Sequence, residues 1–385
     1  MKRLERRTLL TTLAGLPLVG LLGGAAVKKD VAEMTEITKA PKFRGVVYDV
    51  GLNFTGTGFS VEPFSPALVE HDLRTIKDAL HCTAVRIEGE EISRLVTASR
   101  IAHKLGLTVF FNPWYMNADA AQLLPYFAEA AEEAEKLKKE GVDIVFVAGC
   151  EYPIFNKGII PGDTLGDRLS GIGAVFGAGP EEHARMWAKL NVDLKSFVDV
   201  IRPKFSGPVT YAATQFEQVD WSIFDIVGID HYRAAETAEK YVEELDKYRL
   251  NKPLVVMEVG SCAYVGAAKL GGGGFMVLEG TNPDGTAKFK DGIVPTRSEA
   301  EQAGYVEEQV RLVSNAGVDG VFIYVFSFPL YPVGEGVTDL DMVGYSLVKT
   351  YPDDDPRSKA MPPWAPKEAF HRLAGIYQRM KTIKG

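Results

Sequence analysis

Cysteine is scarce in this sequence, with three residues among 385. Cys82, Cys150 and Cys262 lie too far apart to match the ligand spacing of a zinc motif. They are therefore expected to be buried as small hydrophobic side chains. A disulfide that joins Cys262 to Cys82 or to Cys150 stays open as an alternative, because the N-terminus described below predicts export.

Positive charge is also in short supply. The chain has 43 Lys and Arg residues against 51 Asp and Glu residues, and its net charge is −8. No basic stripe interleaved with aromatic residues occurs, so nucleic acid is not expected as a partner. The apolar content of 46% and the charged content of 24% are those of a globular protein. Nothing in the sequence indicates an oligomeric state.

Motifs that bind cofactors or metals are missing as well. The segment GLNFTGTG (51–58) is a poor match to a dinucleotide-binding fingerprint. The glycine run Gly271–Gly274 is not a phosphate-binding P-loop, because no Gly-Lys-Ser/Thr follows it, and we interpret it as a flexible rim. The first apolar run, YDVGLNF, lacks the His-x-His of metal-dependent hydrolase barrels, and no inner strand ends in a Schiff-base lysine. We therefore expect neither a cofactor nor a metal.

The N-terminus has the pattern of an export signal, and we assign residues 1–27 to it. Arg6 and Arg7 precede an apolar stretch (9–22) and small residues, which resembles a twin-arginine signal. The apolar stretch is short and rich in Gly and Pro, so a stable membrane span is not expected after processing, although a retained anchor stays open. Residues 28–43 form a polar linker. The protein is thus expected to be exported, to the bacterial periplasm, cell surface or exterior.

Residues 44–385 repeat one unit, an apolar run followed by a segment with helical periodicity. Eight such units predict an α/β fold, a (β/α)8 TIM barrel, over a single domain. A doubly wound sheet is the alternative, but it usually carries a Gly-rich phosphate turn after its first strand. The predicted strands are 43–54, 82–89, 107–114, 142–148, 208–216, 224–233, 252–261 and 318–328, and the predicted helices are 66–80, 91–105, 118–140, 180–203, 235–248, 298–316 and 366–381.

Two of the apolar runs end in a carboxylate. Val142–Ala148 breaks at Gly149 and is followed by Glu151, and KPLVVMEVGS (252–261) contains Glu258 near its end. The carboxyl ends of barrel strands carry the chemistry of this fold, so the two carboxylates are the leading catalytic candidates. Long loops at 261–297 and 329–365 emerge beside Glu258. Other polar or aromatic candidates at strand ends are Asp49, Arg86, Glu88, Asn112, Trp114, Asp230, His231, Tyr232 and Tyr324.

Over about 44–380, these strand ends resemble those of the (β/α)8 retaining glycosidases of clan A. The resemblance implies that Glu151, on strand four, is the general acid/base and that Glu258, on strand seven, is the nucleophile. VGIDHYR resembles the IGINYY segment of those enzymes, whose Tyr hydrogen-bonds the nucleophile. That role falls to Tyr232, with His231 as the other candidate. The opening VVYDVGLNF is also similar to bacterial barrel proteins labelled "abortive infection", a label that implies no chemistry.

The resemblance implies further substrate contacts and also has gaps. Arg86 matches the Arg that ends strand two, and Asn112 with Trp114 matches the sugar-lining positions of strand three. Cys150 stands where the clan has an Asn before the acid/base, and Tyr324 lies where a Trp usually floors the sugar site. Asp49 completes the expected substrate-contacting set.

Retaining hydrolysis needs two carboxyl groups about 5 Å apart, one protonated and one ionised. Arg86 would favour the ionised form of Glu258, while Glu151, between Cys150 and Tyr152, would keep its proton longer. The sequence therefore predicts a hydrolase that cleaves a β-linked saccharide or glycoside with retention. A non-catalytic barrel that binds sugar or serves as a scaffold is the alternative, supported by the missing Asn.

Overall fold

Eight parallel strands close into a barrel in the structure, a computed structural model that describes residues 36–282, 284 and 286–383. The first strand pairs in parallel with both the second and the last, and this pairing closes the ring. The predicted (β/α)8 fold is confirmed. The predicted export signal and the first half of the predicted linker lie outside the described residues. In ring order the strands are β1 (Phe43–Asp49), β10 (Gly320–Ile323), β7 (Leu254–Val259), β6 (Val227–Asp230), β5 (Val209–Thr214), β4 (Ile144–Cys150), β3 (Thr108–Pro113) and β2 (Ala84–Gly89).

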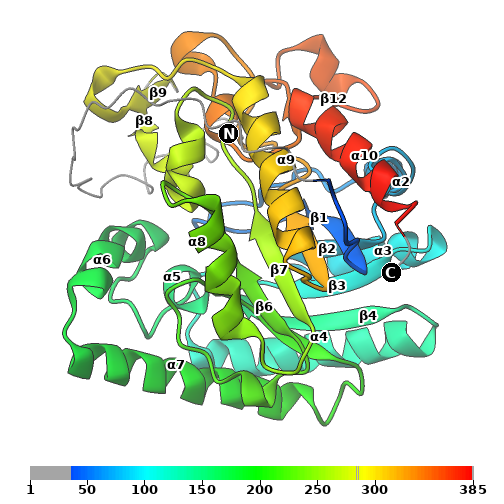
Figure 1. Cartoon of the computed structure of the whole chain (residues 1–385), viewed down its shortest axis with the longest axis vertical. Helices are drawn as coiled ribbons and strands as arrows, with labels where there is room; N and C mark the ends of the chain where they lie inside the picture. Colours follow the sequence, from blue (N-terminus) through cyan, green and yellow to red (C-terminus); the bar gives the residue numbers. More distant parts are fainter. Residues whose placement is uncertain (1–35, 283, 285, 384–385) are drawn as a thin grey trace.

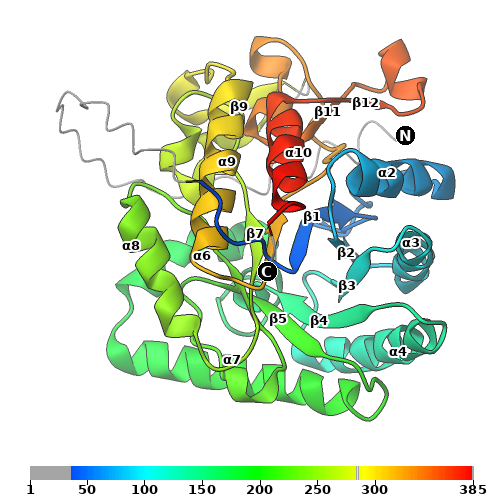
Figure 2. The same cartoon turned by 45° about the vertical axis from the view of Figure 1, so that its right-hand side comes forward.

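Helices surround the barrel, and neighbours in sequence pack side by side (Figures 1 and 2). In both views the red C-terminal helix lies against the yellow-orange helix that precedes it, and its Tyr377 hydroxyl donates to the carbonyls of Gly45 on β1 and Val321 on β10. Among the described residues, no helix has the length and apolar character to cross a membrane. The helices of the strand–helix units are α2 (Pro66–Asp78), α3 (Ile92–Lys104), α4 (Ala120–Lys139), α7 (Pro180–Ile201), α8 (Ala238–Glu243), α9 (Glu299–Asn315) and α10 (Glu368–Met380).

Side-chain alternation along the strands divides the core into two layers. On β2, Val85 and Ile87 belong to the cluster between barrel and helices, whereas Ala84 belongs to the cluster inside the barrel. Because successive strand residues face opposite sides, Arg86 and Glu88 also point inward, above Ala84. The barrel interior therefore changes from apolar at its base to charged at the carboxyl ends of its strands.

Several segments differ from the sequence-based expectation. Two helices, α5 (Tyr152–Phe155) and α6 (Leu165–Gly177), follow β4 and were not predicted. The predicted helix 235–248 is α8 followed by a 3-10 helix. The Gly271–Gly274 run is not an open rim loop but the start of a 3-10 helix. The long loops contain two small hairpins, β8 (Leu278–Thr281) with β9 (Ala287–Phe289) and β11 (Val348–Thr350) with β12 (Trp364–Pro366).

The cysteines are all buried, as expected, and all three thiols are free. The alternative disulfides of Cys262 with Cys82 or Cys150 are therefore not formed. Cys82 packs in the outer core, Cys150 in the barrel interior, and Cys262 among the loops above the barrel, so the three occupy different hydrophobic clusters.

Candidate active site

Beta-bulges in β4 and β7 turn their polar ends into the barrel. On β7, Val255 and Met257 lie in the interior cluster, so strict alternation would direct Glu258 outward. The pairing instead places two residues of β7 against one of β6, between Val256 and Glu258. Such a bulge re-aims the side chain that follows it. Glu258 therefore points inward, where it meets Arg86.

An equivalent irregularity occurs in β4. The register with β5 shifts between Val147 and Cys150, and Gly149 adopts φ +106°, which suits a residue without Cβ. Cys150 consequently joins the interior cluster. Glu151 then takes a left-handed conformation, φ 43°, at the start of α5. Such a conformation costs a non-glycine residue roughly 1–3 kcal/mol and is typical of functional positions.

Glu258 is held by two side chains, one at each of its carboxylate oxygens. Arg86 Nη1 donates to its Oε1 at 2.8 Å, and the hydroxyl of Tyr232 donates to its Oε2 at 3.0 Å. Arg86 is itself oriented by Asn112, whose Oδ1 accepts a hydrogen bond from Arg86 Nε at 2.9 Å. The contacts stabilise an ionised carboxylate and fix both of its oxygens.

Arg86 is the cation at the centre of a buried group of acidic side chains. Besides Glu258, it lies 3.6 Å from Glu88 and 3.8 Å from Asp230. Both oxygens of Glu88, Oδ1 of Asp230 and Nη2 of Arg86 make no hydrogen bond. Burial raises the pKa values of Glu88 and Asp230 well above the usual range, and the charge of Glu258 raises them further. We call Arg86, Glu88, Asp230 and Glu258 the floor cluster.

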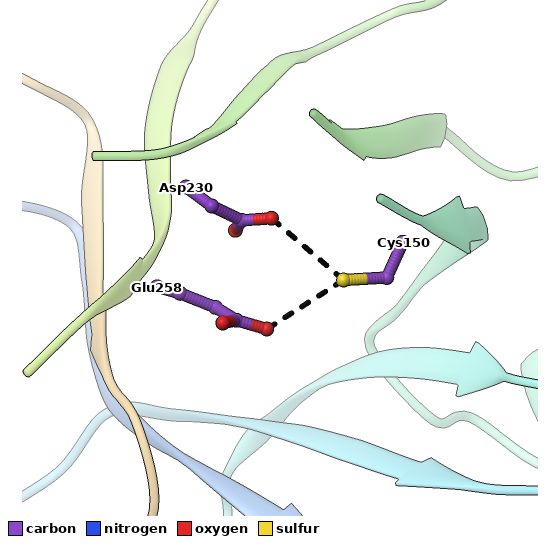
Figure 3. A group of neighbouring side chains, drawn as sticks. All are labelled: Cys150, Asp230 and Glu258. Atoms are coloured by element: carbon purple, nitrogen blue, oxygen red, sulfur yellow. Dashed lines mark hydrogen bonds between the residues drawn. The ribbon is translucent and has the colours of Figure 1, made fainter. Parts of the chain in front are cut away.

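Cys150 approaches the floor cluster from β4 (Figure 3). Its Sγ lies 3.7 Å from Asp230 Oδ2 and 3.6 Å from Glu258 Oε1. Burial raises the pKa of this thiol, so it stays protonated and acts as a weak donor to both carboxylates. The three groups are close enough to ligate one cation. Arg86, however, already provides positive charge between the same carboxylates, and a thiol is a poorer ligand than a thiolate.

Glu151 has an electrostatic environment unlike that of Glu258. Burial raises its pKa well above the ordinary value, and the negative charges of Glu258 and Glu217 add to this effect. Glu217 accepts hydrogen bonds from the Tyr211 hydroxyl at 2.7 Å and from the Thr214 amide at 2.8 Å, and burial raises its pKa to about 7. Glu151 is thus suited to keep a proton that Glu258 has lost.

Both catalytic candidates line one cavity of about 530 Å³ at the carboxyl ends of the strands. Asp230, Trp114, Tyr232 and Tyr324 line it as well. The remaining lining is largely apolar. It comes from the loop after β1, from α5 and α6, from the segment after β5, and from the long loops after β7 and β10. These apolar and aromatic residues are Phe54, Ile154, Phe155, Leu165, Leu169, Ile172, Phe176, Phe216, Leu270, Phe275, Met276, Val325, Phe328, Tyr331, Val343 and Tyr345.

Four of the predicted substrate contacts lie beneath or beside this cavity and do not line it. Arg86 and Asn112 are fully buried and act on Glu258 from below. Asp49 accepts a hydrogen bond from the Gly51 amide at 2.7 Å, which stabilises the turn after β1. His231 accepts from Gln215, donates to the Tyr241 carbonyl and stacks on that ring.

The choice between His231 and Tyr232 as partner of Glu258 is therefore settled by geometry, in favour of Tyr232. Burial lowers the pKa of His231 to about 4, which leaves a neutral ring that supports the sheet end.

The helix α6, which contributes apolar residues to the cavity lining, was not predicted, although its sequence contains a helix signal. Thr164 and Asp167 form a capping box, and the apolar residues that follow have helical spacing.

Comparison with known proteins shows the fold. No protein-family model and no curated protein matches the sequence. A solved GH113 β-1,4-mannanase is 15% identical, with a TM-score of 0.54, over 88% of this chain and 99% of that one. GH5_18 from Streptomyces cattleya, solved with GlcNAc, is 13% identical, with a TM-score of 0.53, over 90% and 82% of the two chains.

A family 1 β-glucosidase from Thermotoga maritima gives a TM-score of 0.52 at 11% identity, over 90% of this chain and 99% of that one. These neighbours share an architecture with this chain at low sequence identity. The described chain therefore has the (β/α)8 barrel fold found in glycoside hydrolases of clan A.

Proposed function

We propose that the protein is a retaining glycoside hydrolase that cleaves a β-linked saccharide or glycoside. The observation that carries the proposal is a pair of carboxylates on one cavity with opposite electrostatic environments. Glu258 accepts hydrogen bonds from Arg86 and Tyr232, whereas burial and nearby negative charge raise the pKa of Glu151. Retaining hydrolysis requires one ionised and one protonated carboxyl group.

In the proposed reaction, Glu258 attacks the anomeric carbon while Glu151 gives its proton to the departing glycosidic oxygen. The C–O bond to the aglycone breaks, and an ester forms between the sugar and Glu258. Glu151, now ionised, removes a proton from a water molecule that attacks the same carbon, and the ester breaks. Each carboxylate ends in its starting protonation state, and the sugar is released with its configuration retained.

A barrel that binds sugar without cleaving it is the second candidate. The position before Glu151 favours it, because Cys150 is fully buried and its thiol faces Asp230 and Glu258. The clan's Asn at this position contacts the sugar 2-hydroxyl, a contact that strengthens in the transition state. Cys150 provides no such amide. The two candidates differ in whether any glycosidic bond is broken.

The test begins with a screen of aryl β-glycosides and oligosaccharides against the wild-type protein. On a cleaved substrate, Glu258→Ala should abolish turnover, and azide should restore it with inverted product. Glu151→Ala should retain turnover of substrates with good leaving groups, because they need no proton in the first step, and azide should rescue it with retention. Glu279→Ala, on β8 outside the cavity, is the matched control and should leave the rate unchanged.

Two results would contradict the assignment. If Glu258→Ala kept more than a small fraction of the activity, another residue would be the nucleophile. If sugars bound to the wild-type protein in calorimetry but no glycoside were cleaved, the non-catalytic candidate would replace the hydrolase.

Export by a twin-arginine route is a separate proposal and rests on Arg6 and Arg7 together with the apolar stretch after them. Changing both arginines to lysine should leave the unprocessed precursor in the cytoplasm, measured by cell fractionation and blotting. Unchanged processing and location would rule out this route.

A further inference from the structure

One face of α6 forms an apolar wall beside the carboxylates. Leu165, Leu169, Ile172 and Phe176 recur at intervals of four, three and four residues, which places them on one side of a helix. All four line the cavity that also contains Glu151 and Glu258. The exposed fraction rises from 4% at Leu165 to 64% at Phe176, so the wall leads from the interior to solvent.

α6 is anchored firmly enough to act as a binding surface. A capping box of Thr164 and Asp167 starts the helix. Arg168, fully buried, donates to the carbonyls of Ile154 at 2.7 Å and Phe155 at 3.1 Å, and to Asn117 Oδ1 at 2.6 Å. Because these bonds tie α6 to the backbone of α5, the wall has a fixed position relative to Glu151, at the start of α5.

The other side of the cavity is apolar as well. Leu270 and the 3-10 helix with Phe275 and Met276 contribute from the loop after β7. Gly272 lets this helix approach closely, since a Cβ there would lie 3.3 Å from the Tyr232 ring. Phe216 also lines the cavity, with its ring 5.4 Å from that of Phe176. Apart from the carboxylates, the polar side chains in the lining are Thr55, Thr214, Gln215 and the tyrosines, so the cavity divides into a carboxylate region and a mostly apolar remainder.

The carboxylate region suits a sugar, whereas the apolar region suits an apolar group attached to it. A second sugar unit placed between Leu169, Ile172 and Met276 would lose water from its hydroxyls without gaining hydrogen bonds, which is costly. An alkyl or fused-ring group would instead bury apolar area on both sides. The cavity volume of about 530 Å³ lies within the range for ligands larger than one sugar ring.

We propose that the substrate is a glycoside with a large apolar aglycone, which lies along α6 while the sugar contacts the carboxylates. This inference rests on the proposed function, because it assigns the aglycone side of the same site. The aglycone leaves the cavity at Phe176, where the wall meets solvent. Release of the hydrolysed aglycone would then follow the same path.

Calorimetric binding to the Glu258→Gln protein tests the inference without interference from turnover. The probes are methyl, n-butyl and n-octyl β-D-glucosides and β-D-mannosides, below the concentration at which they form micelles, with cellobiose and mannobiose for comparison. Each buried methylene should tighten binding roughly threefold, so octyl, with four more methylenes, should bind about 80-fold more tightly than butyl. The disaccharides should bind no more tightly than the methyl glycosides.

Wall variants identify where the chain binds. In the Glu258→Gln background, Ile172→Ser should reduce the octyl-over-butyl advantage at least tenfold. Phe176→Ala, at an exposed side chain with little risk to folding, should reduce it about threefold. Val192→Ser on α7 is the matched control, since Val192 is 65% exposed and does not line the cavity, and it should change nothing. Circular dichroism and thermal melts verify that each variant is folded.

The outcomes separate this inference from the proposed function. Equal affinity for methyl and octyl glycosides, tighter binding of a disaccharide, or an octyl advantage that both wall variants leave intact would overturn the apolar aglycone. Tight octyl binding that the wall variants weaken, without hydrolysis of any glycoside by the wild-type protein, would support the aglycone assignment and overturn the hydrolase.

Discussion

Two clusters of charged side chains, one buried and one partly buried, differ in how completely their charges are neutralised. The floor cluster has one cation, Arg86, among three carboxylates. The second cluster joins the long loops to α9 and α10, and we call it the loop cluster. It contains as many cations as carboxylates, namely Arg297, Lys349 and Lys367 with Glu299, Asp339 and Asp341.

In the loop cluster, every carboxylate meets a cation at hydrogen-bond distance. Arg297 donates to Asp341 and Glu299 at 2.8 Å and to Asp339 at 2.9 Å. Burial alone would raise the pKa of Glu299, but hydrogen bonds from Arg297 and Lys349 lower it to about 2. The ionised, paired form is the stable one, which is what a structural role requires.

In the floor cluster the pKa shifts run the other way. Burial and mutual repulsion raise the pKa values of Glu88 and Asp230, and several of their oxygens lack hydrogen bonds. Buried charge without full compensation opposes folding, so its presence at a cavity supports the proposed catalytic role over a stabilising one. The contrast therefore predicts that a mutation in the floor cluster will lower activity without lowering stability. A mutation in the loop cluster is expected to lower stability without lowering the activity of the folded protein.

The largest effect is expected for Glu258→Gln. Loss of the proposed nucleophile should lower kcat for any cleaved aryl glycoside by at least three orders of magnitude. The free energy of unfolding should stay equal or rise, because one of three mutually repelling carboxylates becomes neutral. Steady-state kinetics and urea denaturation measure the two quantities. A large loss of stability in Glu258→Gln would contradict the distinction, because the floor cluster would then stabilise the fold as the loop cluster does.

The complementary change is Asp341→Asn in the loop cluster. Asp341 is fully buried and contacts both Arg297 at 2.8 Å and Lys367 at 3.2 Å. Removing its charge leaves the buried Lys367 and the partly buried Arg297 underpaired and should lower the free energy of unfolding by about 3 kcal/mol. The folded fraction should keep a kcat within about twofold of wild type, because Asp341 does not line the cavity. Unaltered urea denaturation would contradict the structural role.

A smaller effect is expected for Tyr232→Phe, which removes the 3.0 Å hydrogen bond to Glu258. A hydrogen bond to a charged group contributes about 1.5–3 kcal/mol, so kcat should fall roughly 10- to 100-fold. Tyr345→Phe is the matched control, because that hydroxyl donates to the Gly272 carbonyl at 2.9 Å instead. Equal losses in the two variants would mean that Tyr232 acts only by packing.

The smallest effect concerns pH. Glu217 raises the pKa of Glu151 through its negative charge, which it carries above its own pKa of about 7. Glu217→Gln removes this repulsion, so Glu151 loses its proton more easily and the alkaline limb of kcat/KM should move to lower pH by roughly 0.5–1 unit. If the alkaline limb of the Glu217→Gln profile stays in place or moves to higher pH, the ionisation behind that limb is not that of Glu151.

The barrel and the position of the two catalytic candidates could be predicted from the sequence, because the strands are long apolar runs with polar ends. Those runs predict the eight barrel strands, and the residues after them predict that Glu151 and Glu258 share one face. The bulges could not be predicted. Strict alternation on β7 would place Glu258 outside the barrel, and only the pairing with β6 reveals the extra residue.

The roles of neighbouring residues also depended on the tertiary structure. His231 and Tyr232 are adjacent in sequence, and which of them faces Glu258 depends on where β6 ends. Arg86 and Asn112 were expected to contact substrate, whereas the depth of their side chains in the barrel makes them supports of Glu258. The wall on α6 required a helix that the sequence analysis did not propose.

Trapping of the covalent intermediate tests the central claim most directly. Fluorine in place of the sugar 2-hydroxyl slows both steps of a retaining reaction, while a good leaving group keeps the first one fast, so the sugar ester accumulates. A 2-deoxy-2-fluoro aryl β-glycoside of a cleaved sugar would be incubated with the wild-type protein and followed by intact mass and peptide mapping. The account predicts one fluorosugar attached to Glu258. An adduct on another residue, or none although the parent glycoside is hydrolysed, would contradict it.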